Sequence, residues 1–355
     1  MTKKVLIVGA TLHGVNAVSS IMEGIVQAAP KNCEIFCFGF EENNGAVYEP
    51  GNYLIQNPYE GYSPLALYFR LQRKYLHLRK KDSALLASSY IFHRLEAVTR
   101  QQKFDLVIAV IGQFCYAEAA YLYASKHHIP LKIIYFDPFT DKTLSAIFPH
   151  RISVEKRWVS YADELYYNLE NVFPSKETLN KKWIGFYIPI IPKDLTHWQL
   201  NRTLVYGGTF YPKIREPQLL YDFAVSIENR GVEVECYATL KTYPKQSSIR
   251  FFPLLTREAF SQKCREARAL IYIGNTNFVS KSSKYLEYVA WRKPIVGINV
   301  EPDNDVRKYK YYFDAQDKDL IGKLNEVSPE ELKNYNPAND FPERDPRQLA
   351  ERLFA

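Results

Sequence analysis

The sequence predicts an α/β protein made of two wound domains, each with a parallel sheet covered by helices. Continuously apolar strand segments alternate with segments of helical periodicity in both halves of the chain, which is the pattern of buried parallel sheets. A chain of 355 residues also exceeds the size at which one hydrophobic core usually keeps growing. Its apolar fraction of 46% and aromatic fraction of 15% exclude general disorder.

In the first half, residues 4–9 form an apolar strand that turns into a helix, where apolar residues recur at helical spacing from Val18 to Val26. Further strands are expected at residues 33–40, 105–112 and 131–136, with a helix at residues 116–128. Because strand and helix alternate in order, the first half is predicted to be a Rossmann-like layer.

The same alternation restarts after a Pro-bearing stretch, residues 188–194, which is typical of a linker. Strands are expected at residues 204–208, 232–238, 250–252, 269–274 and 294–300, with helices at residues 216–230 and 256–268. We therefore predict two Rossmann-like domains, residues 1–195 and 196–340, facing a central cleft at the carboxyl ends of both sheets. A terminal amphipathic helix within residues 341–355 either crosses back to the first domain or caps its own domain.

Charge and cysteine content narrow the class of protein. The net charge of +7, from 46 basic and 39 acidic residues, suits a polyanionic ligand or an anionic surface and is below that of a dedicated nucleic-acid binder. The five cysteines lie mostly in apolar stretches, which predicts reduced core thiols in a cytoplasmic protein, and no Cys and His cluster has metal-site spacing. No apolar run reaches the ~20 residues that a membrane-spanning helix needs.

The most informative stretch is a polar turn that opens a short helix, within residues 280–298. Ser282 and Ser283 are good N-cap residues, so the free N–H groups of the helix start can receive an anion, and Lys284 adds a cation beside them. Glu287 lies three residues after Lys284 and four after Ser283, which places these side chains on one helix face. A phosphate and a hydroxyl-rich group are therefore expected to bind here together.

This segment resembles the donor-binding segment of GT-B glycosyltransferases, especially the retaining enzymes of polysaccharide biosynthesis that carry paired glutamates. In that family the second glutamate holds the ribose of a nucleotide-sugar, and the helix start faces the diphosphate. Glu287 matches the second glutamate, whereas the first falls at Val279. The resemblance implies a nucleotide-sugar site at Ser282, Ser283, Lys284 and Glu287.

A second candidate segment follows the first strand of the second half. Its candidate residues are Gly207, Gly208, Thr209, Lys213 and Arg215. Glycines after a strand allow close backbone approach to a phosphate, and a basic residue a few positions later can neutralise it. The segment is similar to the family's Tyr-x-Gly motif with a downstream base that balances the departing diphosphate; of the two bases, Arg215 is the better bidentate donor. The alternative is an ordinary strand-to-helix turn with solvated charges.

The loop after the first strand of the chain supplies Gly9, His13 and Gly14. A dinucleotide fingerprint needs a glycine where Thr11 stands, so a nicotinamide oxidoreductase is the least favoured alternative. In GT-B enzymes the equivalent loop faces the cleft near the diphosphate or the acceptor, which would make His13 a polar contact there. The alternative is an ordinary surface histidine.

Two aspartates mark the expected acceptor side. Asp137 and Asp141, followed by a Glu-Lys-Arg helix within residues 155–163, resemble a motif of polysaccharide-building members of the family. Either aspartate can bind sugar hydroxyls or act as a base; the alternative is an Asx-type cap around Pro138. The resemblance also implies that the nucleotide base lies near Leu254.

A basic amphipathic segment lies in the first half. Residues 70–81 carry six formal positive charges and no acid, and Leu71, Tyr75 and Leu78 are spaced for one helical face. Such a helix suits an anionic membrane surface, and peripheral glycosyltransferases with lipid-linked acceptors often display one. The alternative is a solvated basic helix.

These observations and the resemblance predict a retaining GT-B glycosyltransferase that moves a sugar from a nucleotide-sugar to a saccharide or lipid-linked saccharide, in cell-surface polysaccharide or glycoconjugate synthesis. Arg215, Lys213 and Lys284 would stabilise negative charge on the leaving diphosphate, with no cofactor and no obligatory metal. The protein is expected in the cytoplasm, and membrane binding by the basic segment would place it at the inner face of the cell membrane. The alternatives are a nucleotide-sugar 2-epimerase and, because the first glutamate is missing at Val279, a non-catalytic saccharide-binding or partner protein on the same scaffold.

Overall fold

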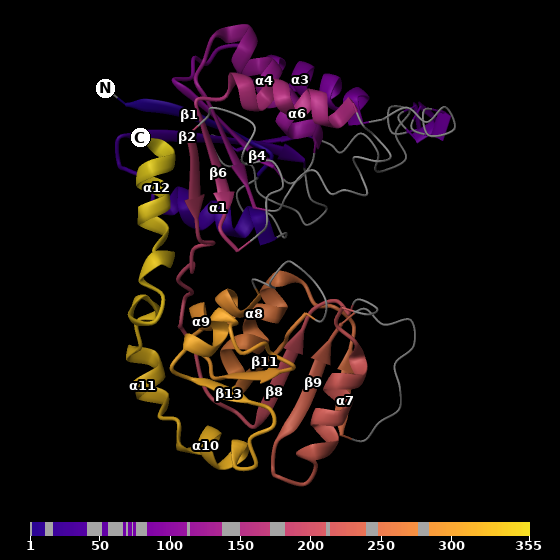
Figure 1. Ribbon diagram of the computed structural model, residues 1–355, viewed down its shortest axis with the longest axis vertical. Coiled ribbons are helices and arrows are strands. Elements are labelled where there is room, and N and C mark those ends of the chain that lie inside the picture. Colours follow the sequence, from indigo (N-terminus) through magenta and orange to yellow (C-terminus); the bar gives the residue numbers. More distant parts are fainter. Residues whose placement is uncertain are drawn as a thin grey trace. The chain divides into compact units, whose positions relative to one another are not determined.

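The computed structural model of the protein forms two compact units (Figure 1). It describes residues 2–10, 17–40, 52–55, 67–68, 70–72, 74–75, 84–111, 114–136, 150–170, 182–210, 214–238, 248–275 and 284–355. The first unit comprises Met1–Ile188 together with Arg347–Ala355, and the second comprises Pro189–Pro346. Each unit contains one parallel sheet.

The sheet of the first unit is built from apolar strands. They are β1 (Lys3–Val8), β2 (Cys33–Phe40), β3 (Asn52–Ile55), β4 (Leu106–Ile111), β5 (Leu131–Tyr135), β6 (Glu164–Asn168) and β7 (Lys182–Phe186). They lie in the order β3-β2-β1-β4-β5-β6-β7, and every pair is parallel. The helices of this unit that the structure describes without gaps are α1 (Ala17–Gln27), α3 (Ala84–Thr99), α4 (Phe114–His127), α6 (His150–Tyr161) and α12 (Pro346–Phe354). Figure 1 shows α3, α4 and α6 over one face of the sheet and α1 on the other, which explains why β4 is buried along its whole length.

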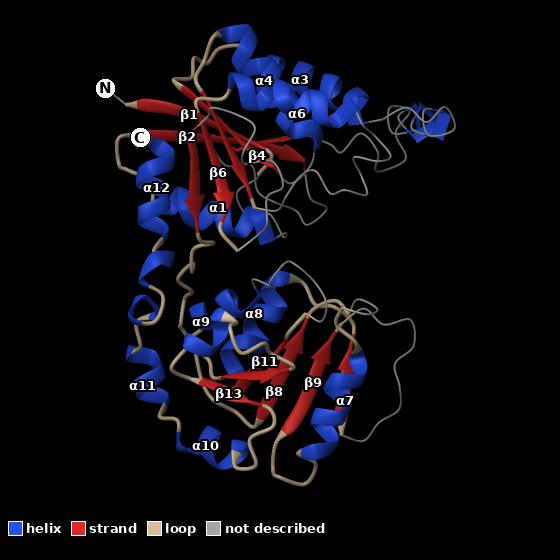
Figure 2. Cartoon of the chain, viewed as in Figure 1, coloured by secondary structure: helices blue, strands red, loops and turns tan. Residues whose placement is uncertain are grey.

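The second unit repeats this plan with a smaller sheet. Its strands are β8 (Thr203–Gly207), β9 (Glu233–Tyr237), β10 (Ile249–Phe252), β11 (Ala269–Ile273), β12 (Ile295–Ile298) and β13 (Tyr312–Asp314). They lie in the order β10-β9-β8-β11-β12-β13, again all parallel (Figure 2). The helices are α7 (Pro217–Ser226), α8 (Arg257–Glu266), α9 (Lys284–Ala290), α10 (Leu320–Glu326) and α11 (Pro329–Asn334).

The two sheets confirm the predicted fold class of two Rossmann-like α/β layers. One predicted helix is shorter than expected. The sequence predicted a helix over residues 216–230, whereas α7 ends at Ser226. The N–H of Glu228 donates to the carbonyl of Val225, and the N–H of Arg230 donates to that of Ile227. These tight three-residue turns replace the helical pattern, and Asn229 adopts a left-handed φ of 65° between them.

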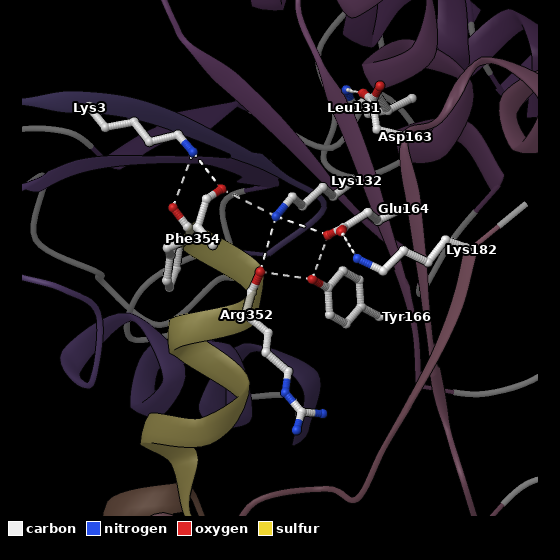
Figure 3. Close-up of polar contacts among 10 residues, drawn as sticks. Lys3, Leu131, Lys132, Asp163, Glu164, Tyr166, Lys182, Arg352 and Phe354 are labelled. Atoms are coloured by element: carbon white, nitrogen blue, oxygen red, sulfur yellow. Dashed lines mark hydrogen bonds and ion pairs between the residues drawn. The ribbon is translucent and has the colours of Figure 1, made fainter.

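Helix α12 docks on the sheet of the first unit through its last carbonyl groups (Figure 3). The ammonium of Lys3 donates to the carbonyl of Ala355 at 2.6 Å. The carbonyl of Arg352 accepts from Lys132 Nζ at 3.0 Å and lies 2.8 Å from the hydroxyl of Tyr166. The last turn of a helix leaves its carbonyls without helical partners and carries partial negative charge, so these lysines both satisfy and neutralise it.

The carboxylate of Glu164 organises the same cluster. It accepts from Lys182 Nζ at 2.7 Å and from the Tyr166 hydroxyl at 2.8 Å, and it lies 3.0 Å from the ammonium of Lys132. Burial acts to raise the pKa of Glu164, but these hydrogen bonds and charges outweigh burial and lower it to about 2. The carboxylate therefore ties β5, β6 and β7 together beneath α12.

Replacing Glu164 by Gln is expected to lower the free energy of unfolding on the order of 2 kcal/mol at neutral pH. Because its pKa in the folded chain lies below the ordinary value of 4.5, the carboxylate stabilises the fold above pH 4.5 and loses this effect as the pH falls toward 2. The gap between wild type and Glu164→Gln should thus shrink over that range in urea denaturation curves. Glu34→Gln, an exposed substitution in the same sheet, serves as the control; a constant gap at all pH values would contradict the assignment.

Candidate functional site

The strand order of the second sheet has a switch point between β8 and β11. Strands β9 and β10 extend the sheet from one side of β8, whereas β11, β12 and β13 extend it from the other. In such sheets the loops that leave the two central strands diverge at the carboxyl edge, and ligands bind in the crevice between them. The residues that follow β8 and β11 are therefore the natural place for a site.

Two glycines lie at the carboxyl end of β8. A Cβ atom on Gly207 would lie 2.1 Å from the ring of Phe260, so only glycine lets α8 pack against the strand end. A Cβ atom on Gly208 would lie 3.9 Å from Nη1 of Arg215. The N–H of Gly208 donates to the carbonyl of Tyr237 at 3.1 Å. Gly208 thus leaves room beside Arg215, but its own amide is already bonded and is not available to a phosphate. The next predicted site residue, Thr209, is half-buried.

Arg215 and Asn275 pair across the switch point. Arg215 lies in the connection after β8, Asn275 follows β11, and Nη2 of the arginine donates to Oδ1 of the asparagine at 2.6 Å. The Nε atom of Arg215 is buried and has no hydrogen-bond partner among the described residues. The hydrogen bond to Asn275 therefore fixes the guanidinium at the carboxyl edge of the sheet. At this edge the sequence predicts a cation that binds a diphosphate.

Lys284 and Glu287 meet on α9, as their three-residue spacing predicts. Lys284 Nζ lies 2.7 Å from Glu287 Oε2, and both side chains are half-buried. The ammonium also lies 4.8 Å from the centre of the Phe260 ring, the same ring that packs against Gly207. The hydroxyl of Tyr288 lies 3.5 Å from the carbonyl of Gly207. Helix α9 is thereby held against the end of β8, and the two predicted segments form one cluster.

The electrostatics of this cluster favour an anion. Burial acts to raise the pKa of Glu287, but the charges of Lys284, Lys193 and Arg257 outweigh burial and hold this pKa below its ordinary value of 4.5. The carboxylate is therefore ionised at neutral pH. Lys284, Lys193 and Arg257 thus place positive charge around this carboxylate, which suits a diphosphate.

Aromatic side chains lie at the neighbouring strand ends. The rings of Tyr237, at the end of β9, and Phe252, at the end of β10, stack at 5.0 Å with an angle of 16° between their planes. Leu254, predicted to lie near a nucleotide base, follows two residues after Phe252 with 51% of its surface exposed. An exposed apolar side chain next to an aromatic pair is a surface on which a planar base can lie.

In the first unit, Gly9 lies at the equivalent switch point, between β1 and β4. Its φ is 101°, and a Cβ atom there would lie 2.5 Å from the carbonyl oxygen of Val110. Its N–H donates to the carbonyl of Phe38 at 2.9 Å. Backbone packing alone therefore requires glycine at this position, and its amide is not available to an anion.

Several predicted site residues lie outside the described residues. They are His13, Gly14, Asp137, Asp141, Lys213, Ser282 and Ser283. The helix that follows the two aspartates is described, and its charged residues join elements of the first unit. Glu155 accepts from the hydroxyl of Tyr135 at 3.3 Å, and Asp163 accepts from the N–H of Leu131 at 2.9 Å. Contacts of α6 with β5 account for Glu155, and a contact of the turn after α6 with the start of β5 accounts for Asp163.

The thiol and acidic side chains of the described residues are dispersed and do not form a metal site. Within the described ranges, no group of three or more His, Cys, Asp or Glu side chains is placed to hold a metal ion. The five cysteines are free, and all except Cys33 are buried. Burial raises the pKa of Cys37 and of Cys236 to about 12, so these thiols are protonated and unreactive at neutral pH.

The sequence did not reveal every member of the cluster. Asn275 was missed, although its position directly after a buried strand is a usable signal because polar residues at carboxyl ends of parallel strands face the switch point. Lys193 and Arg257 were missed because nothing in their local sequence links them to Glu287. Their proximity arises only from tertiary packing.

Solved structures of similar architecture match the whole chain. CalG4, the calicheamicin glycosyltransferase, matches 99% of this chain and 97% of its own, with 14% identity and a TM-score of 0.54. The UDP-GlcNAc 2-epimerase from Methanocaldococcus jannaschii matches 99% of both chains, with 12% identity and a TM-score of 0.56. HepE of Anabaena in complex with UDP and glucose matches 99% of this chain and 98% of its own, with 9% identity and a TM-score of 0.59.

At these identities the likeness concerns the fold. The chain has the GT-B fold of two Rossmann-like domains, as the resemblance in its sequence implied. No protein-family model matches the sequence, and no curated protein matches it significantly.

Proposed function

We propose that this chain of GT-B fold is a glycosyltransferase that moves a sugar from a nucleotide-sugar donor to a saccharide or lipid-linked saccharide. The observation that carries the proposal is the cluster at the switch point of the second sheet. There Arg215, held by Asn275, and the pair of Lys284 and Glu287 lie at the carboxyl ends of β8 and β11. A diphosphate is bound strongly by cations and ribose hydroxyls donate strong hydrogen bonds to a carboxylate, and the cluster offers both groups. The complex of HepE with UDP and glucose supports the same class of ligand for this fold.

Catalysis in this proposal comes from charge stabilisation. Transfer breaks the bond between the anomeric carbon and a diphosphate oxygen and forms a bond from the anomeric carbon to the acceptor oxygen, whose proton passes to the departing diphosphate. Negative charge therefore grows on the diphosphate as the sugar leaves. Arg215, with Lys213 and Lys284, stabilises that charge. Cations that are fixed before the reaction lower the barrier because no reorganisation is needed as the charge develops. The hydrogen bond that Arg215 donates to Asn275 fixes the guanidinium in this way.

We assign the donor to the second unit and the acceptor to the first. Glu287 accepts hydrogen bonds from the ribose, while Lys284, its ion-pair partner, turns toward the diphosphate. Asp137 or Asp141 binds the acceptor hydroxyl. We propose that the donor's anomeric configuration is retained, as in the enzymes with paired glutamates, and that residues other than Val279 hold the transferred sugar.

A thermal-shift panel of nucleoside diphosphates and nucleotide-sugars tests the donor site. We expect one nucleobase series to raise the melting temperature by several degrees, since a ligand that binds only the folded state stabilises it. The matching nucleotide-sugar is then incubated with saccharide acceptors, and the anomeric configuration of the product is read by NMR.

Each alternative has its own outcome in these experiments. No shift with any nucleotide would contradict the donor site and favour a non-catalytic scaffold. Conversion of the donor sugar without any acceptor would favour a nucleotide-sugar 2-epimerase. Donor binding without transfer to any saccharide would favour a saccharide-binding or partner protein.

A further inference from the structure

A buried arginine of the second unit packs against α9, the helix that carries Lys284 and Glu287. Arg344 is 1% exposed, and no other arginine in the described part of the chain is buried to this degree. The central carbon of its guanidinium lies 5.7 Å from the centre of the Tyr285 ring and 5.9 Å from that of Phe341. The arginine thus contacts the second residue of the helix.

Tyr285 anchors α9 on the side turned away from Glu287. At about 100° per residue, the two side chains lie about 160° apart around the helix. The Tyr285 ring is fully buried, and it meets the ring of Tyr272, near the end of β11, edge to face at 5.9 Å. Its other aromatic neighbour is Phe341, at 6.2 Å. Packing on Tyr285 therefore determines how α9 presents Glu287 on its opposite side.

The position of Arg344 is itself fixed from two directions. Its carbonyl accepts from the N–H of Ile190 at 3.0 Å, and its N–H donates to the carbonyl of Phe341 at 3.1 Å. Its Nη2 atom lies 3.1 Å from Oδ2 of Asp305, a carboxylate that also pairs with Lys308 at 2.8 Å. The guanidinium cannot turn away from Tyr285 without leaving this carboxylate.

Stability alone does not explain a buried arginine at this place. Removing two charges from water costs about as much free energy as their attraction returns, so a buried ion pair is weak evidence for stability. What the arginine adds is direction, since its planar guanidinium stacks on a ring while its fork binds a carboxylate at a defined angle. The charges that hold the pKa of Glu287 low are those of Lys284, Lys193 and Arg257. The contact of Arg344 with α9 is instead one of packing, through Tyr285.

We propose that Arg344 is a positioning residue for the donor site. By packing on Tyr285 it fixes the orientation of α9 in which Lys284 reaches the diphosphate and Glu287 reaches the ribose. Arg344 is too deeply buried to touch the donor itself. The inference rests on the proposed function, because it adds a residue to the same nucleotide-sugar site.

A double-mutant cycle tests this role by isothermal titration calorimetry with UDP, ADP, CDP and GDP. Arg344→Met is expected to weaken binding of the diphosphate that the wild type binds by about tenfold, since misplacing a contact group is enough to lose its contribution. In a Glu287→Ala background the same substitution should cost about threefold or less, because effects that act through one contact are not additive. A merely structural effect would lower affinity by the same factor in both backgrounds.

Arg268→Met is the matched control. Arg268 is half-buried just before β11, at the opposite end of the strand from the site, and donates to the carbonyl of Leu324. Its replacement should lower the melting temperature and leave diphosphate affinity unchanged. Arg344→Lys is the milder variant if Arg344→Met does not fold; it keeps a cation for Asp305 but loses the planar group that stacks on Tyr285, so its affinity should lie between those of wild type and Arg344→Met.

Amide hydrogen exchange of the unliganded chain provides a readout that needs no nucleotide. Both Arg344 variants should speed exchange in α9 more than in β8 or β11, because local opening reports the loss of local packing. Unchanged exchange in α9, unchanged diphosphate affinity, or an equal cost with and without Glu287 would each overturn the role of Arg344. Absence of diphosphate binding by the wild type would overturn the proposed function instead, and exchange would then decide whether Arg344 orders α9.

Discussion

Replacement of Arg215 by Ala is expected to lower kcat of the proposed transfer about 100- to 1,000-fold. The guanidinium lies beside Gly208 at the switch point, where in the proposed reaction its charge would stabilise the leaving diphosphate. Since that charge is largest when the sugar has partly left, the loss should fall mainly on kcat, with a smaller change in KM. Steady-state kinetics with the donor identified by the thermal-shift panel measures both constants. Arg202→Ala, an exposed substitution just before β8 at the opposite end of the strand, is the matched control.

Two further variants separate charge from position. Arg215→Lys keeps a cation but loses the planar fork that bonds to Asn275, and Asn275→Ala keeps the guanidinium but frees it. Each should lower kcat less than Arg215→Ala does, because the positive charge is retained although its position is no longer fixed by the hydrogen bond to residue 275. If Arg215→Ala raises KM and leaves kcat unchanged, the arginine binds the donor uniformly and does not act on the transition state.

Replacement of Glu287 by Ala is expected to weaken nucleoside diphosphate binding about 10- to 100-fold, because hydrogen bonds to a charged acceptor contribute about 1.5–3 kcal/mol each. The same change leaves Lys284 without its ion-pair partner. The cation is then more available to phosphates, so pyrophosphate, which has no ribose, should bind as well as before or better. Isothermal titration calorimetry with both ligands reads this contrast.

The control for this variant is Glu326→Ala, which removes an exposed carboxylate at the end of α10. Equal affinity of wild type and Glu287→Ala for the nucleoside diphosphate would remove Glu287 from the ribose site. A parallel loss of pyrophosphate binding would mean instead that the carboxylate serves only to position Lys284.

The strands that were predicted from the sequence are mostly apolar, although β2, β9 and β10 each include charged residues. β4 reads Leu-Val-Ile-Ala-Val-Ile and is buried at every position, so its sequence alone identifies it. β6 and β7 were missed because each has only five residues, Glu-Leu-Tyr-Tyr-Asn and Lys-Trp-Ile-Gly-Phe, in which a charged first residue leaves no long apolar run. These first residues, Glu164 and Lys182, are paired across the strands and bonded at 2.7 Å. Neither charge indicates a strand until its partner is known.

In the candidate site, too, local contacts could be predicted from the sequence and long-range contacts could not. Lys284 and Glu287 are three residues apart in the sequence, so the helical repeat alone predicted that their side chains meet. The link between Arg215 and Asn275 spans two strand ends far apart in sequence, and only the sheet order makes them neighbours. Glycines were the least informative residues, since the tight packing at Gly207 and Gly9 explains them without any ligand.

The docking of α12 affects the order in which the two units complete their folding during synthesis on the ribosome. The first unit contains Met1–Ile188 and Arg347–Ala355, so the whole second unit is translated between its two parts. Until then the buried ammonium of Lys132 lacks the carbonyl of Arg352, and Lys3 lacks that of Ala355. Domains usually finish in the order of synthesis. Here the unit that begins first is completed last, and the second unit can be fully folded while the first still lacks one helix.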